Sequence, residues 1–140
     1  MTERLDSGVS GMDVSARTRK TQPVVRTVLI VDDDPWCRQA ARMVLAARGF
    51  RVVGEADGAV QALALARQMR PDSVLLDVYL RDGDGVAVAE RLSATGGCRV
   101  VLTSNDRHAA PDRVIRSCGA AGFVSKENLA GPALNAYLAG

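Results

Sequence analysis

The sequence predicts an α/β fold in which a doubly wound parallel sheet of five strands is flanked by five helices. Short apolar runs rich in β-branched residues alternate five times with longer segments of helical pattern. Several of these runs are apolar at every position rather than at every second one, which is typical of parallel strands covered on both faces. Glycines and prolines fall at the joints between the segments, where the chain must turn.

Each element is predicted from its own pattern. Pro35 suits the first turn of the first helix, and Ala41, Val44 and Leu45 then lie on one side of it. The predicted strands cover 27–32, 51–55, 73–77, 99–103 and 121–125, and the predicted helices cover 35–48, 58–69, 85–94, 111–118 and 129–138.

Length, charge and cysteine pattern restrict the functions that this sequence could have. The 140 residues suffice for one ordinary domain, predicted over residues 27–140, after a polar, aperiodic extension over residues 1–26 that is predicted to be disordered. The net charge of +2 gives no overall attraction to nucleic acid or membranes. The cysteines Cys37, Cys98 and Cys118 form no CxxC pair, and no apolar run is long enough for a membrane span or a signal peptide. We therefore expect a cytoplasmic protein with reduced thiols.

Polar side chains gather at the predicted strand ends. Ligands of open α/β sheets bind at the carboxyl ends of the strands. Grouped carboxylates there offer oxygen ligands to a hard cation such as Mg²⁺ or Mn²⁺, whose charge offsets their mutual repulsion. Asp34 also suits the N-cap of the next helix. The strand-end residues are Asp32-Asp33-Asp34, Asp77, Thr103-Ser104 and Ser125-Lys126.

The lysine at the last strand end is unusual for this chain. Sixteen of the eighteen basic residues are arginines, and the two lysines are Lys20 and Lys126. A compact ammonium contacts a phosphate oxygen as a point charge, unlike the planar guanidinium fork. The pattern therefore favours a phosphate-handling role for Lys126.

The sequence resembles the receiver domain of two-component response regulators, which has the (βα)5 flavodoxin-like fold. The resemblance covers residues 27–140, and its motifs follow in the family's order and spacing. They are VDDDP (31–35), PDSVLLDVYLRDGDG (71–85), VVLTS (100–104) and AGFVSK (121–126).

The resemblance implies a chemistry for the strand-end residues. Asp77 matches the phosphoacceptor, and Asp32 with Asp33 matches the acidic pair that holds Mg²⁺ together with Asp77 and the backbone carbonyl of Tyr79. Lys126 matches the family lysine that contacts the phosphoryl group. The protein would then be no enzyme in its own right, but a phosphoacceptor that assists its own phosphorylation and dephosphorylation.

The resemblance also implies a switch. Thr103 matches the hydroxyl that moves toward the phosphoryl group, and Phe123 matches the aromatic residue that rotates into the space behind it. Tyr79 and Asn105 stand where family members tune the lifetime of the phosphate. A bulky Tyr79 would shield the acyl phosphate from water.

The implied partners are a sensor histidine kinase or phosphotransfer protein and a downstream protein. The downstream protein would bind the surface formed by the last strand and the two helices beside it. The chain ends at Gly140, about where a receiver ends, so we expect a regulator without an output domain, or a fragment of a longer one. We expect no direct contact with nucleic acid and no membrane association, and a phosphorylation-dependent homodimer stays open.

The sequence departs from the family at three positions. Leu80 and Arg81 replace the usual Met-Pro pair, and Glu127 replaces the proline after the lysine. Without the proline, the loop after Asp77 should be looser.

Three alternatives stay open. A haloacid dehalogenase-type phosphatase would use Asp32 as its nucleophile, but it leaves Asp77 without a central role and lacks a late acidic pair. A calcium loop in RDGDG (81–85) fails in register, so a turn is expected there. A degenerate receiver would only bind partners.

Overall fold

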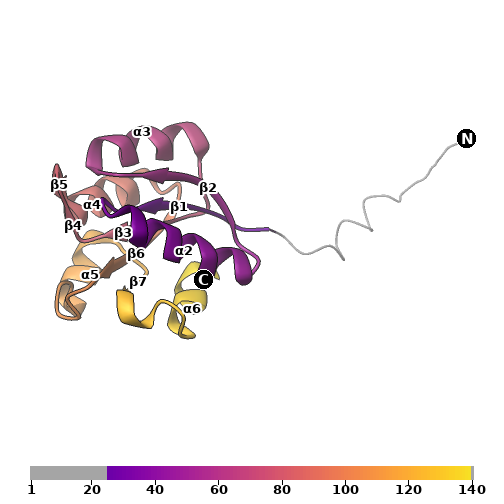
Figure 1. Cartoon of the computed structure of the whole chain (residues 1–140). Helices are drawn as coiled ribbons and strands as arrows, with labels where there is room; N and C mark the ends of the chain where they lie inside the picture. Colours follow the sequence, from indigo (N-terminus) through magenta and orange to yellow (C-terminus); the bar gives the residue numbers. More distant parts are fainter. Residues whose placement is uncertain (1–24, 140) are drawn as a thin grey trace, which may run out of the picture.

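The computed structural model describes residues 25–139 and confirms the predicted fold (Figure 1). Five parallel strands form one sheet in the order β2-β1-β3-β6-β7, which runs from β2 down to β7 in Figure 1. The predicted disorder of residues 1–26 falls, except for residues 25 and 26, outside the described residues. The strands of the sheet are β1 (Thr27–Val31), β2 (Arg51–Ala56), β3 (Ser73–Asp77), β6 (Arg99–Ser104) and β7 (Gly122–Ser125).

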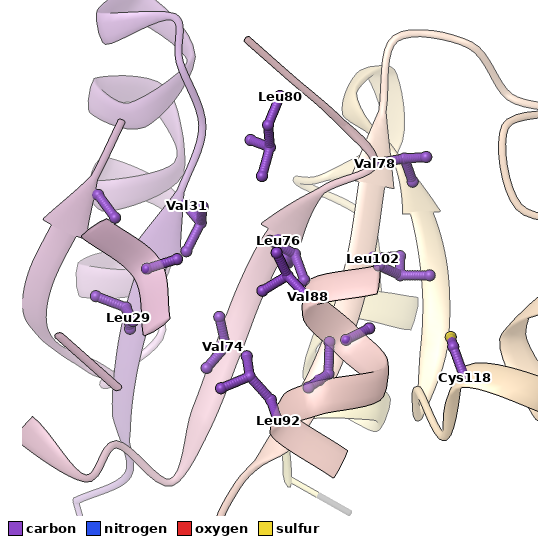
Figure 2. Close-up of a cluster of buried hydrophobic side chains, with 14 of the residues drawn as sticks. Leu29, Val31, Val74, Leu76, Val78, Leu80, Val88, Leu92, Leu102 and Cys118 are labelled. Carbon is purple, nitrogen blue, oxygen red and sulfur yellow. The ribbon is translucent and has the colours of Figure 1, made fainter. Parts of the chain in front are cut away.

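Helices cover both faces of this sheet. The buried side chains of α2 and α6 pack on one face, and those of α3, α4 and α5 pack on the other. Figure 2 shows the second of these clusters, with the strand residues Val74 and Leu76 beside Val88 and Leu92 of α4. The helices are α2 (Pro35–Ala47), α3 (Ala59–Met69), α4 (Gly85–Thr95), α5 (Asp112–Cys118) and α6 (Ala133–Ala139).

The sheet is buried because its strands are apolar on both faces. Val28 and Ile30 face the α2 and α6 side, whereas Leu29 and Val31 face the other side. All four side chains are at most 1% exposed. A side-chain period of two therefore feeds two cores, as the unbroken apolar runs predict.

The predicted last helix over 129–138 was wrong at its start. A short 3₁₀ helix, η1 (Lys126–Asn128), follows β7, and α6 begins at Ala133. Pro132 explains the break, because proline has no backbone N–H and disfavours helical backbone in the residue before it. Arg48 at the end of α2 fastens this segment by donating to the carbonyl of Gly131 at 2.8 Å and to Asn135 Oδ1 at 2.7 Å.

The start of α4 and the end of α3 place unusual demands on the backbone. A Cβ at Gly85 would lie 2.1 Å from the carbonyl oxygen of Asp77, so only glycine lets α4 start against the end of β3. Helices α4 and α5 end in left-handed glycines, Gly96 and Gly119. Helix α3 instead ends in Arg70 at φ +47°, a conformation that costs a non-glycine residue about 1 kcal/mol.

The RDGDG segment forms a turn, as expected, and its two aspartates are used as helix caps. Strands β4 (Tyr79–Leu80) and β5 (Gly83–Asp84) pair antiparallel around it. Asp84 Oδ1 accepts from the Val86 N–H at 2.9 Å and caps α4. Asp82 caps α3 from outside that helix, because its carboxylate accepts from the N–H groups of Ala59 (2.6 Å) and Val60 (3.3 Å). The loop without the family proline therefore has other restraints.

Among residues 25–139, no helix combines the length and the apolar character needed to cross a membrane.

The Asp82 cap gives a pH-dependent prediction. Its two backbone hydrogen bonds, from Ala59 and Val60, lower the pKa of Asp82 below its ordinary value of 3.8. A group with a lowered pKa stabilises the fold above its unfolded pKa, and this stabilisation is lost as the pH falls through the folded pKa. We expect Asp82→Ala to lower the melting temperature by a few degrees at neutral pH and by progressively less below pH 3.8.

Thermal unfolding followed by circular dichroism measures this loss. Glu90→Ala, which removes an exposed carboxylate on α4, is the matched control and should have little effect. A loss for Asp82→Ala that stays constant down to the lowest pH would contradict the capping role.

Candidate functional site

Three consecutive aspartates, Asp32 to Asp34, follow β1, and their side chains have different surroundings. Asp32 is 4% exposed, and its Oδ1 accepts from the Asp34 N–H at 2.9 Å. Asp33 is half-buried. Asp34 caps α2 through Oδ1, which accepts from the Trp36 N–H at 2.9 Å, and this bond lowers the pKa of Asp34. The predicted cap is confirmed, and Asp32 and Asp33 remain at the sheet edge.

Asp77 ends β3 beside this pair. Its side chain is buried, and its Oδ1 accepts from the Tyr79 N–H at 3.1 Å. Burial raises the pKa of the Asp77 carboxyl, because a carboxylate loses hydration away from water, and the neighbouring Asp32 adds to the rise. Hydrogen bonds from Lys126 and Tyr79 oppose the shift without cancelling it.

Lys126 links the two buried carboxylates. Its Nζ lies 2.7 Å from Asp32 Oδ2 and 3.0 Å from Asp77 Oδ2, and its side chain is 11% exposed. Burial alone would lower the pKa of Lys126, but the two carboxylates outweigh it and raise that pKa above its ordinary value. The ammonium is therefore charged and compensates part of the negative charge at this edge.

The carboxylates of Asp32, Asp33 and Asp77 suit a hard divalent cation. Each offers one oxygen, and these oxygens lie within 4.8 Å of one another. Among residues 25–139, no other group of three or more such side chains converges in this way. An all-oxygen donor set of this charge fits Mg²⁺ or Mn²⁺.

Thr103 stands on the neighbouring strand, directly opposite Asp77 in the register of β3 and β6. Its side chain is 3% exposed, and Oγ1 is buried without a hydrogen-bond partner among the described residues. A buried hydroxyl without a partner is costly, so it is available to a group that arrives at this edge.

The remaining predicted residues lie around this core. Phe123 pairs in register with Leu102 and is half-buried against the core that α3, α4 and α5 cover. Tyr79 is 59% exposed and Asn105 is exposed. Phe123 therefore lies against the core beside the site, whereas Tyr79 and Asn105 lie at its solvent-exposed rim.

Sequence reasoning missed Arg38. Its Nη1 donates to the backbone carbonyl of Asp32 at 2.8 Å, and its Nε donates to Glu55 Oε1 at 3.1 Å. Glu55 also accepts from Arg42 Nε at 2.6 Å. These bonds hold the aspartate segment against β2. No spacing in the sequence indicates Arg38, because its partners belong to the segment after β1 and to β2 rather than to its own helix.

Comparison with known proteins agrees with this geometry. The family model of the response regulator receiver domain matches residues 28–136. The transcription regulator BvgA of Bordetella pertussis is 39% identical over 104 residues, which cover 73% of this chain and 50% of BvgA. The transcriptional regulatory protein TcrX of Mycobacterium tuberculosis is 37% identical over 106 residues, covering 75% of this chain and 44% of TcrX. The chain thus spans about half the length of these curated relatives.

Solved structures share the fold of this chain. The receiver domain of the response regulator NarL from Mycobacterium tuberculosis superposes with a TM-score of 0.70 at 29% identity, covering 82% of this chain and 98% of that one. The chemotaxis regulator CheY4 of Vibrio cholerae, at 23% identity, shares the fold with a TM-score of 0.64 and covers 76% of this chain and 93% of its own. Sequence match, fold and the acidic strand-end cluster agree, and the chain belongs to the response regulator receiver domains of two-component signalling.

Proposed function

We propose that this protein accepts a phosphoryl group on Asp77 from a sensor histidine kinase or phosphotransfer protein. The observation that carries the proposal is the position of Asp77. Its carboxylate lies 3.0 Å from Lys126 Nζ and converges with those of Asp32 and Asp33 within 4.8 Å. Receiver domains interact with such kinases and phosphotransfer proteins as a family.

The proposed reaction is a displacement at phosphorus. A carboxylate oxygen of Asp77 forms the new P–O bond as the P–N bond of a phosphohistidine breaks, and the electron pair leaves with the imidazole. Lys126 Nζ, already charged, faces an oxygen of the transferring group. Asp32, Asp33 and Asp77, with the carbonyl of Tyr79, would hold Mg²⁺ or Mn²⁺, which supplies neutralising charge on the same oxygens.

The signal would come from Thr103. The phosphoryl group brings acceptor oxygens to an edge where Thr103 Oγ1 has no partner, so the hydroxyl gains a hydrogen bond by moving toward them. Phe123 would then rotate into the space behind Thr103. The surface of α5, β7 and α6 would change with it, and a downstream protein or a second phosphorylated copy would bind that surface.

Two other readings have less support. A phosphatase with Asp32 as its nucleophile does not fit membership of the receiver family. A degenerate receiver that only binds partners would not need Asp77, Lys126 and Thr103 in this arrangement. In this proposal the receiver domain comprises residues 27–140, and its site residues have the roles described above.

The first prediction from the proposed function concerns covalent phosphorylation. Wild type incubated with Mg²⁺ and acetyl phosphate should gain the mass of one phosphoryl group, whereas Asp77→Asn should gain none because the amide is no nucleophile. Intact-mass spectrometry measures the gain. Asp57→Asn, which changes an exposed acid beyond the end of β2, is the control and should be phosphorylated like wild type.

A gain of mass by Asp77→Asn would contradict the assignment of Asp77. No gain by wild type, from acetyl phosphate or from a kinase, would favour the degenerate receiver.

The second prediction concerns the metal. Trp36 is the only tryptophan, is 78% exposed, and lies two residues after Asp34, so its fluorescence should change when Mg²⁺ binds. Asp33→Asn should weaken binding by about tenfold or more, because second-shell changes alone cost metal sites about 10–100-fold. Asp57→Asn serves as the control. Equal Mg²⁺ affinity of Asp33→Asn and wild type would exclude Asp33 from the metal site.

The third prediction concerns the phosphate lifetime. The exposed ring of Tyr79 stands two residues after Asp77, where it would shield the acyl phosphate from water. Tyr79→Ala should therefore shorten the lifetime several-fold, and Tyr79→Phe, which keeps the ring, should not. Decay of the phosphorylated mass with time is the measurement. Equal decay of wild type and Tyr79→Ala would remove the shielding role.

A further inference from the structure

A second concave site lies at the opposite edge of the sheet. A cleft of about 590 Å³ opens between α3 and α4. Pro71 and Cys98, which line it, stand just before β3 and β6, whereas Asp77 and Thr103 stand at the far ends of the same strands. The cleft is therefore separate from the proposed phosphorylation site, and an inference about it does not depend on that proposal.

The cleft combines an apolar floor with a basic rim. Leu63 and Leu92 contribute apolar surface, and both belong to or pack against the buried core. Arg67, Arg70 and Arg91 are exposed at its sides. No acidic residue lines the cleft, and within residues 25–139 none of the three arginines has an ion-pair partner.

The structural role of arginines at a helix end explains only part of this rim. Arg67 lies in the last turn of α3, where a cation is favourable next to the carbonyl end of the helix. Arg91 lies within α4 rather than at its end, so this reason does not apply to it.

Arg70 is the more telling case. It is the only non-glycine residue with a positive φ among residues 25–139, and it stands where α4 and α5 use Gly96 and Gly119. A strained arginine at a position that suits glycine indicates a use for its side chain.

We propose that this cleft binds a small phosphate-bearing anion with an aromatic body, that is, a ligand of the nucleotide class. Its volume lies within the range of about 300–1,000 Å³ typical of small-molecule sites. Guanidinium groups bind phosphate oxygens in pairs and stack on aromatic faces. The apolar floor accommodates the base, and the three arginines supply charge for at least two phosphate groups.

The test titrates the full chain with ADP in EDTA, so that no metal-dependent phosphate binding occurs at Asp77. Amide NMR shifts of the ¹⁵N-labelled protein should saturate and should centre on Leu92, Thr95 and Gly97, which line the cleft. Adenosine, which lacks the charge, and pyrophosphate, which lacks the aromatic body, should each bind more weakly. Pyrophosphate binding as tightly as ADP would overturn the nucleotide class.

Variants separate binding from folding. Arg91→Gln should weaken ADP binding about tenfold, because charged hydrogen bonds are lost. Arg116→Gln is the control, since it removes an exposed arginine from the last turn of α5, outside the cleft. Arg70→Gly should weaken ADP binding while leaving the melting temperature unchanged or higher, because glycine accepts the left-handed backbone. A merely structural Arg70 would give no loss of binding.

Cysteine protection gives a second readout. Cys98 lines the cleft, whereas the thiol of Cys37 lies near the aspartates and donates to Asp34 Oδ2 at 3.4 Å. ADP should slow alkylation of Cys98 by iodoacetamide and leave Cys37 unaffected. Absence of saturable binding, protection of Cys37 instead of Cys98, or tighter binding of a peptide rich in Glu and Leu than of ADP would each overturn the proposal.

Discussion

The contact of Lys126 with Asp32 and Asp77 is the interaction on which the site depends. It joins the ends of β1 and β3 to the residue that follows β7, across the width of the sheet. Two buried carboxylates at this distance repel each other, and burial already penalises their charged forms. One ammonium between them makes the cluster tolerable without a metal. It also leaves the edge short of positive charge, which is the condition that a divalent cation satisfies.

The parallel sheet provides the geometry for this contact. Because all five strands run the same way, the residues at or just after the carboxyl ends of β1, β3, β6 and β7 meet at one edge although they are far apart in the sequence. The apolar side chains of the strands pack into one core on each face of the sheet, and this packing fixes the register between the strands. The acidic residues at the strand ends are therefore held in place by apolar burial in the middle of the sheet. The hydroxyl of Thr103 lies opposite Asp77 for this reason, and the hydrophobic effect therefore positions the polar chemistry.

Much of this arrangement could be predicted from the sequence, and the failures have physical causes. The five strands were predictable because short apolar runs, several of them unbroken, alternate with segments of helical pattern. The candidate site followed because the ends of parallel strands converge. The start of the last helix was misplaced because the prediction carried the helix across Pro132, whereas α6 begins after this residue. The cap that Asp82 provides, and the clamp formed by Arg38, join residues from different elements. Periodicity and spacing along one segment carry no information on such contacts.

The capping of α3 by Asp82 has a mechanical consequence. The loop that follows Asp77 is bonded at one end to the acidic edge, through the Tyr79 N–H, and farther along to the first turn of α3. Any displacement of this loop must either rotate the beginning of α3 or break the bonds that Asp82 accepts. The loop is thus tied both to the acidic edge and to α3, and the carboxylate of Asp82 provides a restraint in a loop that lacks the family proline. A displacement that starts at Asp77 can in this way be transmitted to α3, which packs near the β2 edge of the sheet, opposite to the β7 edge.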